Sequence, residues 1–111
     1  RIYYNYKYNF KLYIPNNLVN KIYSEQDYQG ENAIFRFYYH DLEENNPKNI
    51  FTIVVSPKLV ADEGKNITNK TNIILGENYD NTFILQKNDE KLLNDLNLTT
   101  EALMEYFSLI Y

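Results

Sequence analysis

The only histidine of the chain stands in its densest cluster of ionisable side chains. His40 is followed closely by Asp41, Glu43 and Glu44. An imidazole nitrogen beside carboxylates can bind a divalent cation or exchange protons with a substrate. The spacing matches neither the spaced oxygen ligands of a Ca²⁺ loop nor the nitrogen and sulfur donors of a Zn²⁺ site. We interpret residues 40–44 as a solvated hairpin tip. The alternative is a metal-dependent or hydrolytic activity centred on His40, Asp41 and Glu43.

Other catalytic constellations are poorly represented. A Ser-His-Asp triad would have to use His40 with Ser24, Ser56 or Ser108, and no G-x-S-x-G elbow is present. Cysteine is absent, and the three glycines are scattered, so the sequence has no thiolate nucleophile and no phosphate-cradling loop. We predict that the chain is not an enzyme and has no cofactor.

Tyrosine is the residue type that gives the chain a potential binding surface. The stretch 1–14, RIYYNYKYNFKLYI, alternates with period 2, with its even positions on an apolar face. Its length predicts a bend near Lys7–Asn9. Tyr3 and Tyr13 then lie on the opposite face, as does Tyr38 in the later run Ala33–Tyr39. We take Tyr3, Tyr13 and Tyr38 as the candidate binding residues, since an exposed phenol ring offers both apolar area and a hydroxyl.

Charge and hydropathy restrict the partners. The formal net charge is -4 and the pI about 4.9. Binding to phosphate backbones or to anionic lipid surfaces depends on basic residues, so we expect neither nucleic acid nor an anionic membrane as partner. No apolar run approaches the roughly 20 residues of a membrane-spanning helix. Because the first residue is Arg1 and not Met, we expect a processed or trimmed chain.

The middle of the chain predicts an antiparallel hairpin. Ala33–Tyr39 and Ile50–Val55 are rich in aromatic and β-branched residues and flank a polar segment with Asn and Pro. The second run is apolar at nearly every position, which indicates a central strand buried on both faces. Asn72–Leu75 and Thr82–Gln86 predict a second hairpin. For Leu18–Glu25 we favour a turn followed by a strand, and we expect a loop over Asp27–Asn32.

Helices are expected at three places. Ser56 and Pro57 would begin a short helix over residues 58–63. Asn88 would cap a helix through Leu96, and Thr99 or Thr100 would cap a last helix over Glu101–Tyr111. In that helix an apolar stripe would pack on the sheet; it consists of Leu103, Phe107 and Ile110. The predicted fold is one α+β domain, residues 1–111, with an antiparallel sheet of five to seven strands and the C-terminal helix packed on one face.

Three stretches carry a family resemblance. Tyr8–Pro15, YNFKLYIP, is similar to the opening strand of PsbP-like domains and of small secreted or lipoprotein-type proteins of low-GC Gram-positive bacteria. Residues 34–39 with 50–55 resemble the middle hairpin of those proteins, and residues 74–85, ILGENYDNTFIL, resemble their hairpin with a G-E-N segment. The resemblance implies a PsbP-like sandwich located outside the cytoplasmic membrane, lipid-anchored in the precursor. It brings no catalytic residues.

These observations together predict a non-enzymatic extracytoplasmic domain. We expect an accessory or binding module at the cell surface, with a cell-envelope protein or a glycan as its partner. The resemblance supplies the location, and the exposed tyrosines supply the binding surface.

Overall fold

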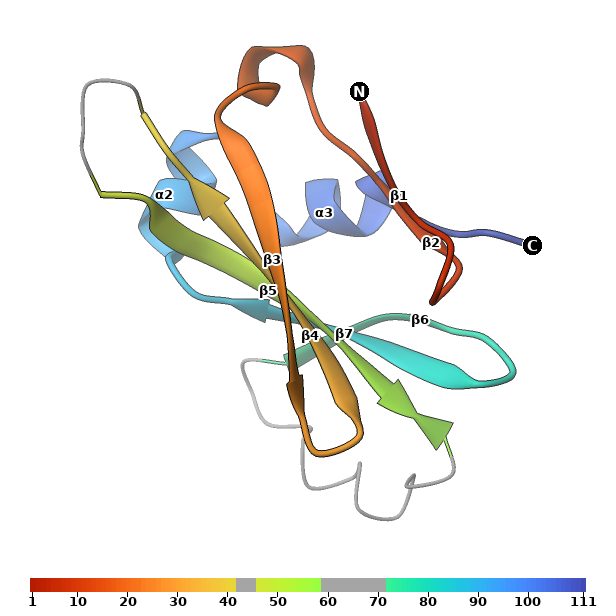
Figure 1. The fold of residues 1–111 in the computed structure, drawn as a ribbon. Coiled ribbons are helices and arrows are strands. Elements are labelled where there is room, and N and C mark those ends of the chain that lie inside the picture. The colour runs from red at the N-terminus through yellow and green to blue at the C-terminus, as the bar shows by residue number, and fades with distance from the viewer. Residues whose placement is uncertain (42–45, 59–71) are drawn as a thin grey trace.

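The computed structural model describes residues 1–41, 46–58 and 72–111. In these residues two antiparallel sheets, of three and five strands, combine with two short α-helices (Figure 1). The elements are β1 (Ile2–Asn5), β2 (Phe10–Tyr13), a 3-10 helix (Asn16–Leu18), β3 (Ile22–Gln29), β4 (Asn32–Tyr39), β5 (Lys48–Pro57), β6 (Asn72–Glu77), β7 (Asn81–Lys87), α2 (Glu90–Asp95), α3 (Thr100–Tyr106) and β8 (Phe107–Leu109). The predicted α+β class is confirmed, although the strands form two sheets rather than one.

The larger sheet has the predicted hairpin at its centre. Its strand order is β3-β4-β5-β7-β6, so β5 is the middle strand. The run Ile50–Val55 is buried throughout, because both faces of β5 are covered. Ile53 and Val55 belong to the main core, whereas Val54 joins a smaller cluster on the other face of the sheet.

Two further hairpins of the larger sheet, β3–β4 and β6–β7, contain a glycine turn and a register shift, respectively. β3 continues to Gln29, so the expected loop over Asp27–Asn32 is reduced to a tight turn at Gly30, whose φ is 59°. Glycine adopts this left-handed conformation without steric penalty, which allows β3 and β4 to pair along their full length. The hairpin of β6 and β7 is confirmed, with a register shift between Ile74 and Gly76.

Ser56 and Pro57 do not begin a helix, contrary to the prediction. They are the last two residues of β5 and pair with β7. β4 pairs with β5 only as far as Val55, so Pro57 has a strand neighbour on one side alone, where a residue without an N–H is tolerated. Most of the expected helix, residues 59–63, lies outside the described residues.

The smaller sheet has the order β1-β2-β8. The predicted bend is confirmed as a four-residue turn over residues 6–9, with Asn9 at φ 59°. This turn length places Tyr3 directly opposite Leu12, on the same face. The prediction that Tyr3 lies away from the apolar face is therefore wrong, because the turn reverses the phase of the alternation. Tyr4 and Tyr6 are exposed instead.

The helix predicted for the C-terminus is shorter than expected. α3 is capped by Thr99, whose hydroxyl accepts a hydrogen bond from the Ala102 amide, as one of the two predicted caps. It ends at Tyr106, and Phe107 begins strand β8 on the free edge of β2. The prediction of a helical stripe through Phe107 and Ile110 is therefore wrong. Residues 107–109 are β-prone, and as a strand they pair with β2, which they could not do as part of a helix.

The preceding helix begins one residue later than predicted. Asp89, not Asn88, caps α2 through a hydrogen bond from the Leu92 amide. Asn88 is engaged elsewhere, because its side-chain oxygen accepts a hydrogen bond from the buried Thr52 hydroxyl at 2.8 Å. α2 also contributes Leu93 to the core.

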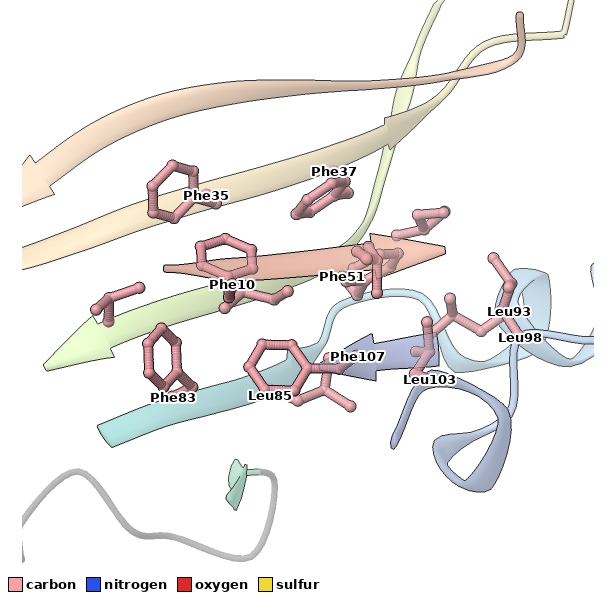
Figure 2. Packing of buried hydrophobic residues seen from close by; sticks show 14 of the residues in the cluster. Phe10, Phe35, Phe37, Phe51, Phe83, Leu85, Leu93, Leu98, Leu103 and Phe107 are labelled. Atoms are coloured by element: carbon pink, nitrogen blue, oxygen red, sulfur yellow. The ribbon is translucent and has the colours of Figure 1, made fainter. Parts of the chain in front are cut away.

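Phe10 of β2 lies at the centre of the aromatic contacts that join the two sheets (Figure 2). Its ring centroid lies 5.4 Å from that of Phe35 in β4, 5.6 Å from that of Phe83 in β7 and 5.7 Å from that of Phe107 in β8. Leu103 of α3 belongs to the same cluster. Burial of these rings between the sheets is the main apolar contribution to the fold.

Candidate ligand-binding cavity

A cavity of about 540 Å³ lies between β1, the edge strand of the small sheet, and β3, the edge strand of the large one. This volume is within the range of roughly 300–1,000 Å³ that is typical of ligand pockets. The lining residues come from β1, β3, β4 and the segments that flank β2 and β3: Arg1, Ile2, Tyr3, Tyr4, Ile14, Val19, Asn20, Ile22, Tyr23, Ser24, Phe37 and His40. We call the space between the two strands the β1–β3 seam.

The two sheets are closed against each other on the opposite side. There a Cβ atom at Gly76 of β6 would lie 3.5 Å from the Phe107 ring and 3.7 Å from the Leu109 side chain, both of β8. That is ordinary van der Waals contact, so β6 and β8 pack directly on each other. The sandwich is therefore filled along β6 and β8 and hollow along the β1–β3 seam.

The free edge of β1 turns its backbone groups toward the seam at every second residue. The Ile14 amide donates to the Arg1 carbonyl at 2.7 Å, which makes these two residues a hydrogen-bonded pair of the β1–β2 ladder. Such pairs alternate along an antiparallel ladder, so Tyr3 is bonded to β2 as well. The N–H and C=O groups of Ile2 and Tyr4 consequently point away from β2.

The same alternation applies to the edge of β3. The His40 amide donates to the Lys21 carbonyl at 2.8 Å, and these residues are in register with the β3–β4 pairs. The backbone groups of Ile22 and Ser24 therefore point away from β4. Since both residues line the cavity, and Ile2 and Tyr4 line it from the other strand, two open strand edges flank one cavity.

The cavity wall is aromatic and aliphatic, with a basic rim. The rings of Tyr3 and Phe37 meet edge to face, with 5.6 Å between their centroids. Ile22 packs against the same core. Arg1 and His40 are the basic side chains of the lining, and no acidic side chain is among the described residues that line it. In a chain with net charge -4, the cationic Arg1 side chain in this lining favours a ligand with an apolar body and an anionic group.

The cavity brings together two of the residues singled out from sequence. Tyr3 and His40 both line it, Tyr3 from β1 and His40 from just beyond β4. Tyr13 does not line it, because its ring packs edge-on against Tyr106 at 5.1 Å. Tyr38 lies on the other face of the large sheet, where it stacks on Tyr23 with 5.3 Å between ring centroids.

The environment of Tyr38 is that of a surface ring beside a carboxylate. Partial desolvation raises the pKa of Tyr38 above its ordinary value, and the negative charge of Glu25 raises it further. This phenol therefore stays protonated at neutral pH and can donate a hydrogen bond. It remains a predicted binding residue, separate from the cavity.

The alternative metal site is only partly described. His40 and Asp41 follow β4, and Glu43 lies outside the described residues. Among the residues that the structure describes, no group of three or more His, Cys, Asp or Glu side chains is arranged to hold a metal ion. A metal-dependent activity of this cluster stays a prediction.

A polar cluster joins the β1–β2 turn to β3 at the other end of the seam. The Lys7 ammonium donates to the Tyr28 hydroxyl at 3.1 Å and lies 5.5 Å from the centroid of that ring. The Gln26 amide donates to the same hydroxyl at 2.7 Å. The hydrogen bond from Lys7 lowers the pKa of Tyr28, and the same contact raises the pKa of Lys7.

Several lining residues could not be singled out from sequence. Ile2, Ile22 and Ser24 belong to ordinary strand patterns, and nothing in their types marks them as functional. The signal that identifies them is the parity of the two ladders, which becomes visible only once strand partners and turn lengths are known.

No helix in the described part of the chain is long and apolar enough to cross a membrane. Comparison with protein-family models, with curated proteins and with solved structures finds no match to this chain.

Proposed function

We propose that this chain is a non-enzymatic binding domain whose ligand occupies the cavity of the β1–β3 seam. The observation that carries the proposal is the composition of the cavity wall: aromatic and aliphatic side chains with Arg1 and His40, in a chain that is otherwise acidic. Cavities of this size and lining are typical of sites that hold a partly apolar ligand through shape and a few polar contacts.

The location of the domain is part of the same proposal. We place it outside the cytoplasmic membrane, at the cell surface, as an accessory module of a lipid-anchored PsbP-like protein that binds a cell-envelope component. This part rests on the sequence resemblance of residues 8–15, 34–39, 50–55 and 74–85 and not on the cavity.

Filling the cavity tests the proposal. The Ser24 side chain lies on the core-facing side of β3 and is half-buried, so Ser24→Trp places an indole in the seam. The matched control is Glu25→Trp, because Glu25 is the next residue of the strand and points to the exposed face. Thermal unfolding is followed against acidic peptides, peptidoglycan fragments, short glycans and dodecanoate.

A ligand of the wild-type protein at about a hundred times its dissociation constant should stabilise the native state by about 2.7 kcal/mol, which raises Tm by several degrees. We expect this shift to disappear in Ser24→Trp and to persist in Glu25→Trp. The proposal fails if both variants keep the shift, or if no compound of the panel moves the Tm of the wild type.

A further inference from the structure

We infer that the ligand of the seam is an extended peptide segment with a carboxylate, which adds to the free edge of β3 as a short strand. This inference rests on the proposed function and names the class of partner. It follows from three features of the seam: the periodicity of its backbone groups, the uncharged side chains of the residues that present those groups, and the cationic side chain of Arg1 at its rim.

The first feature is the spacing of the backbone donors and acceptors. Ile22 and Ser24 present their N–H and C=O groups to the cavity from β3, and Ile2 and Tyr4 do so from β1. Groups that recur at every second residue match the main chain of another strand, and strand addition to an open sheet edge is a general mode of peptide recognition. A compact small molecule cannot satisfy such a row of groups.

The second feature is that the residues whose backbone groups face the seam, Ile2 and Tyr4 of β1 and Ile22 and Ser24 of β3, are themselves uncharged. Sheet edges are commonly protected against strand addition by charged residues. β1 has the sequence Ile-Tyr-Tyr-Asn, and β3 begins Ile-Tyr-Ser, without a charge. The acidic residues of β3, Glu25 and Asp27, come later in the strand. Asp27 is engaged by Arg36 at 3.2 Å.

The Lys7–Tyr28 contact limits the length of the added strand. It joins the β1–β2 turn to β3 four residues beyond Ser24, and closes the seam at that end. The added segment therefore lies beside Ile22–Ser24, at the end of the seam where Arg1 and His40 also line the cavity.

The third feature is charge complementarity. Arg1 and His40 provide the basic groups of the lining, and Lys21 directly precedes β3. None of the described lining residues is acidic, and the Arg1 guanidinium attracts a carboxylate on the peptide. An acidic side chain or a free C-terminal carboxylate supplies the same chemistry, and amidated peptides distinguish the two.

The test uses a phage-displayed library of random heptapeptides selected on the wild-type domain, with synthetic copies of the selected sequences measured by calorimetry. Ser24→Pro removes one N–H that faces the seam and takes no part in the β3–β4 ladder. Ser24→Ala is the matched control, because it removes the hydroxyl and keeps the N–H. We expect Ser24→Pro to bind the peptide at least tenfold more weakly than Ser24→Ala does, because only the proline variant lacks the N–H.

A second measurement does not depend on the folding of Ser24→Pro. Amide hydrogen exchange of the wild type should slow at Ile22 and Ser24 on addition of a selected peptide. Methylation of the peptide nitrogens one at a time should weaken binding at alternate positions. Thermal unfolding of Ser24→Pro without peptide shows whether that variant is folded.

The other outcomes separate the inference from the function on which it rests. Peptides that bind Ser24→Pro as tightly as the wild type, or that leave exchange at Ile22 and Ser24 unchanged, overturn strand addition and leave a cavity that binds side chains. If no peptide is selected but dodecanoate raises Tm, the ligand is a small amphipathic anion and the inference is wrong. Dimerisation of the free domain through β1 and β3 would make a second copy the occupant. If nothing binds, the proposed function fails as well.

Discussion

The Lys7–Tyr28 pair is the contact with the clearest electrostatic consequence. The ammonium group donates to the phenol oxygen and lies over the ring, so it favours the tyrosinate form. The pKa of Tyr28 is therefore lowered and that of Lys7 raised. The centroid of the Tyr8 ring lies 5.6 Å from the same ammonium, and desolvation raises the pKa of the Tyr8 hydroxyl.

Replacing the lysine should reverse the shift. In Lys7→Met we expect the pKa of Tyr28 to rise toward the ordinary tyrosine value, because the main cause of the lowering is the hydrogen bond from Lys7. Carbon NMR of the Tyr28 ring during a pH titration measures this. An unchanged Tyr28 curve would show that the contact does not form.

The sign of the stability effect follows from the same two shifts. A lowered pKa of Tyr28 in the folded state adds stability as pH rises through that lowered pKa, since the folded state then binds fewer protons than the unfolded state. A raised pKa of Lys7 adds stability that is lost as pH rises through the raised value. The free energy of unfolding of the wild type should therefore rise relative to that of Lys7→Met between these two pKa values. Above both values this difference should disappear.

At the scale of elements, the two described glycines differ in backbone conformation, so replacing each by alanine should have opposite effects on stability. Gly30 has φ 59° in the β3–β4 turn, where an L-residue is strained by about 1–2 kcal/mol. Gly76 has no such φ, and a Cβ there would make only an ordinary contact with Phe107. Gly30→Ala should lower the free energy of unfolding by about 1–2 kcal/mol, and the urea midpoint with it. Gly76→Ala should raise the free energy of unfolding by about 0.4–1 kcal/mol, through the lower entropy of the unfolded chain.

Each glycine variant is the control for the other, because both add one methyl group to a strand or turn of the same sheet. Urea unfolding at an unchanged m-value separates stability from changes in the unfolded state. If Gly30→Ala were neutral, the turn would have relaxed to another geometry. If Gly76→Ala were clearly destabilising, the packing of β6 on β8 would be tighter than an ordinary contact.

The long strands could be predicted from sequence because local pattern and tertiary environment agree there. Ala33–Tyr39 and Ile50–Val55 have both the composition and the burial of strands, and both predictions are confirmed. The end of the last helix could not be predicted, because Phe107 fits a helical stripe as well as a strand. Phe107 adopts the strand conformation because it pairs with the free edge of β2, which lies far away in the sequence.

The candidate site was less predictable than the strands, since it depends on how two sheets meet. The length of the β1–β2 turn decides that Tyr3 faces the core, and period-2 alternation through the turn gives the opposite answer. The seam itself exists because β6 and β8 pack together while β1 and β3 do not close. Neither fact is encoded in a local motif, so sequence identified Tyr3 and His40 but none of the edge residues around them.

For the whole molecule, Phe10 is the best single position at which to test whether the two sheets behave as one unit, since it has more ring contacts between the sheets than Tyr3, which contacts Phe37, or Phe107, which contacts Phe83. The fully buried Phe10 ring contacts rings from β4, β7 and β8, and so belongs to both layers. Phe10→Ala should lower the free energy of unfolding by about 3–5 kcal/mol, a large part of the 5–15 kcal/mol typical of a domain. Tyr79→Ala, at an exposed ring, is the control and should change it by less than about 0.5 kcal/mol.

The two optical probes for this experiment report on different parts of the structure. Far-ultraviolet circular dichroism follows the strands, and tyrosine fluorescence follows the rings, with no tryptophan to obscure it. If Phe10 couples the sheets, both probes should show one coincident transition in the wild type and in Phe10→Ala, at a lower midpoint in the variant. A variant whose small sheet melts first, with separate transitions, would show that the sheets are stable independently. The β1–β3 seam would then open before the molecule unfolds, and peptide binding should weaken together with the first transition.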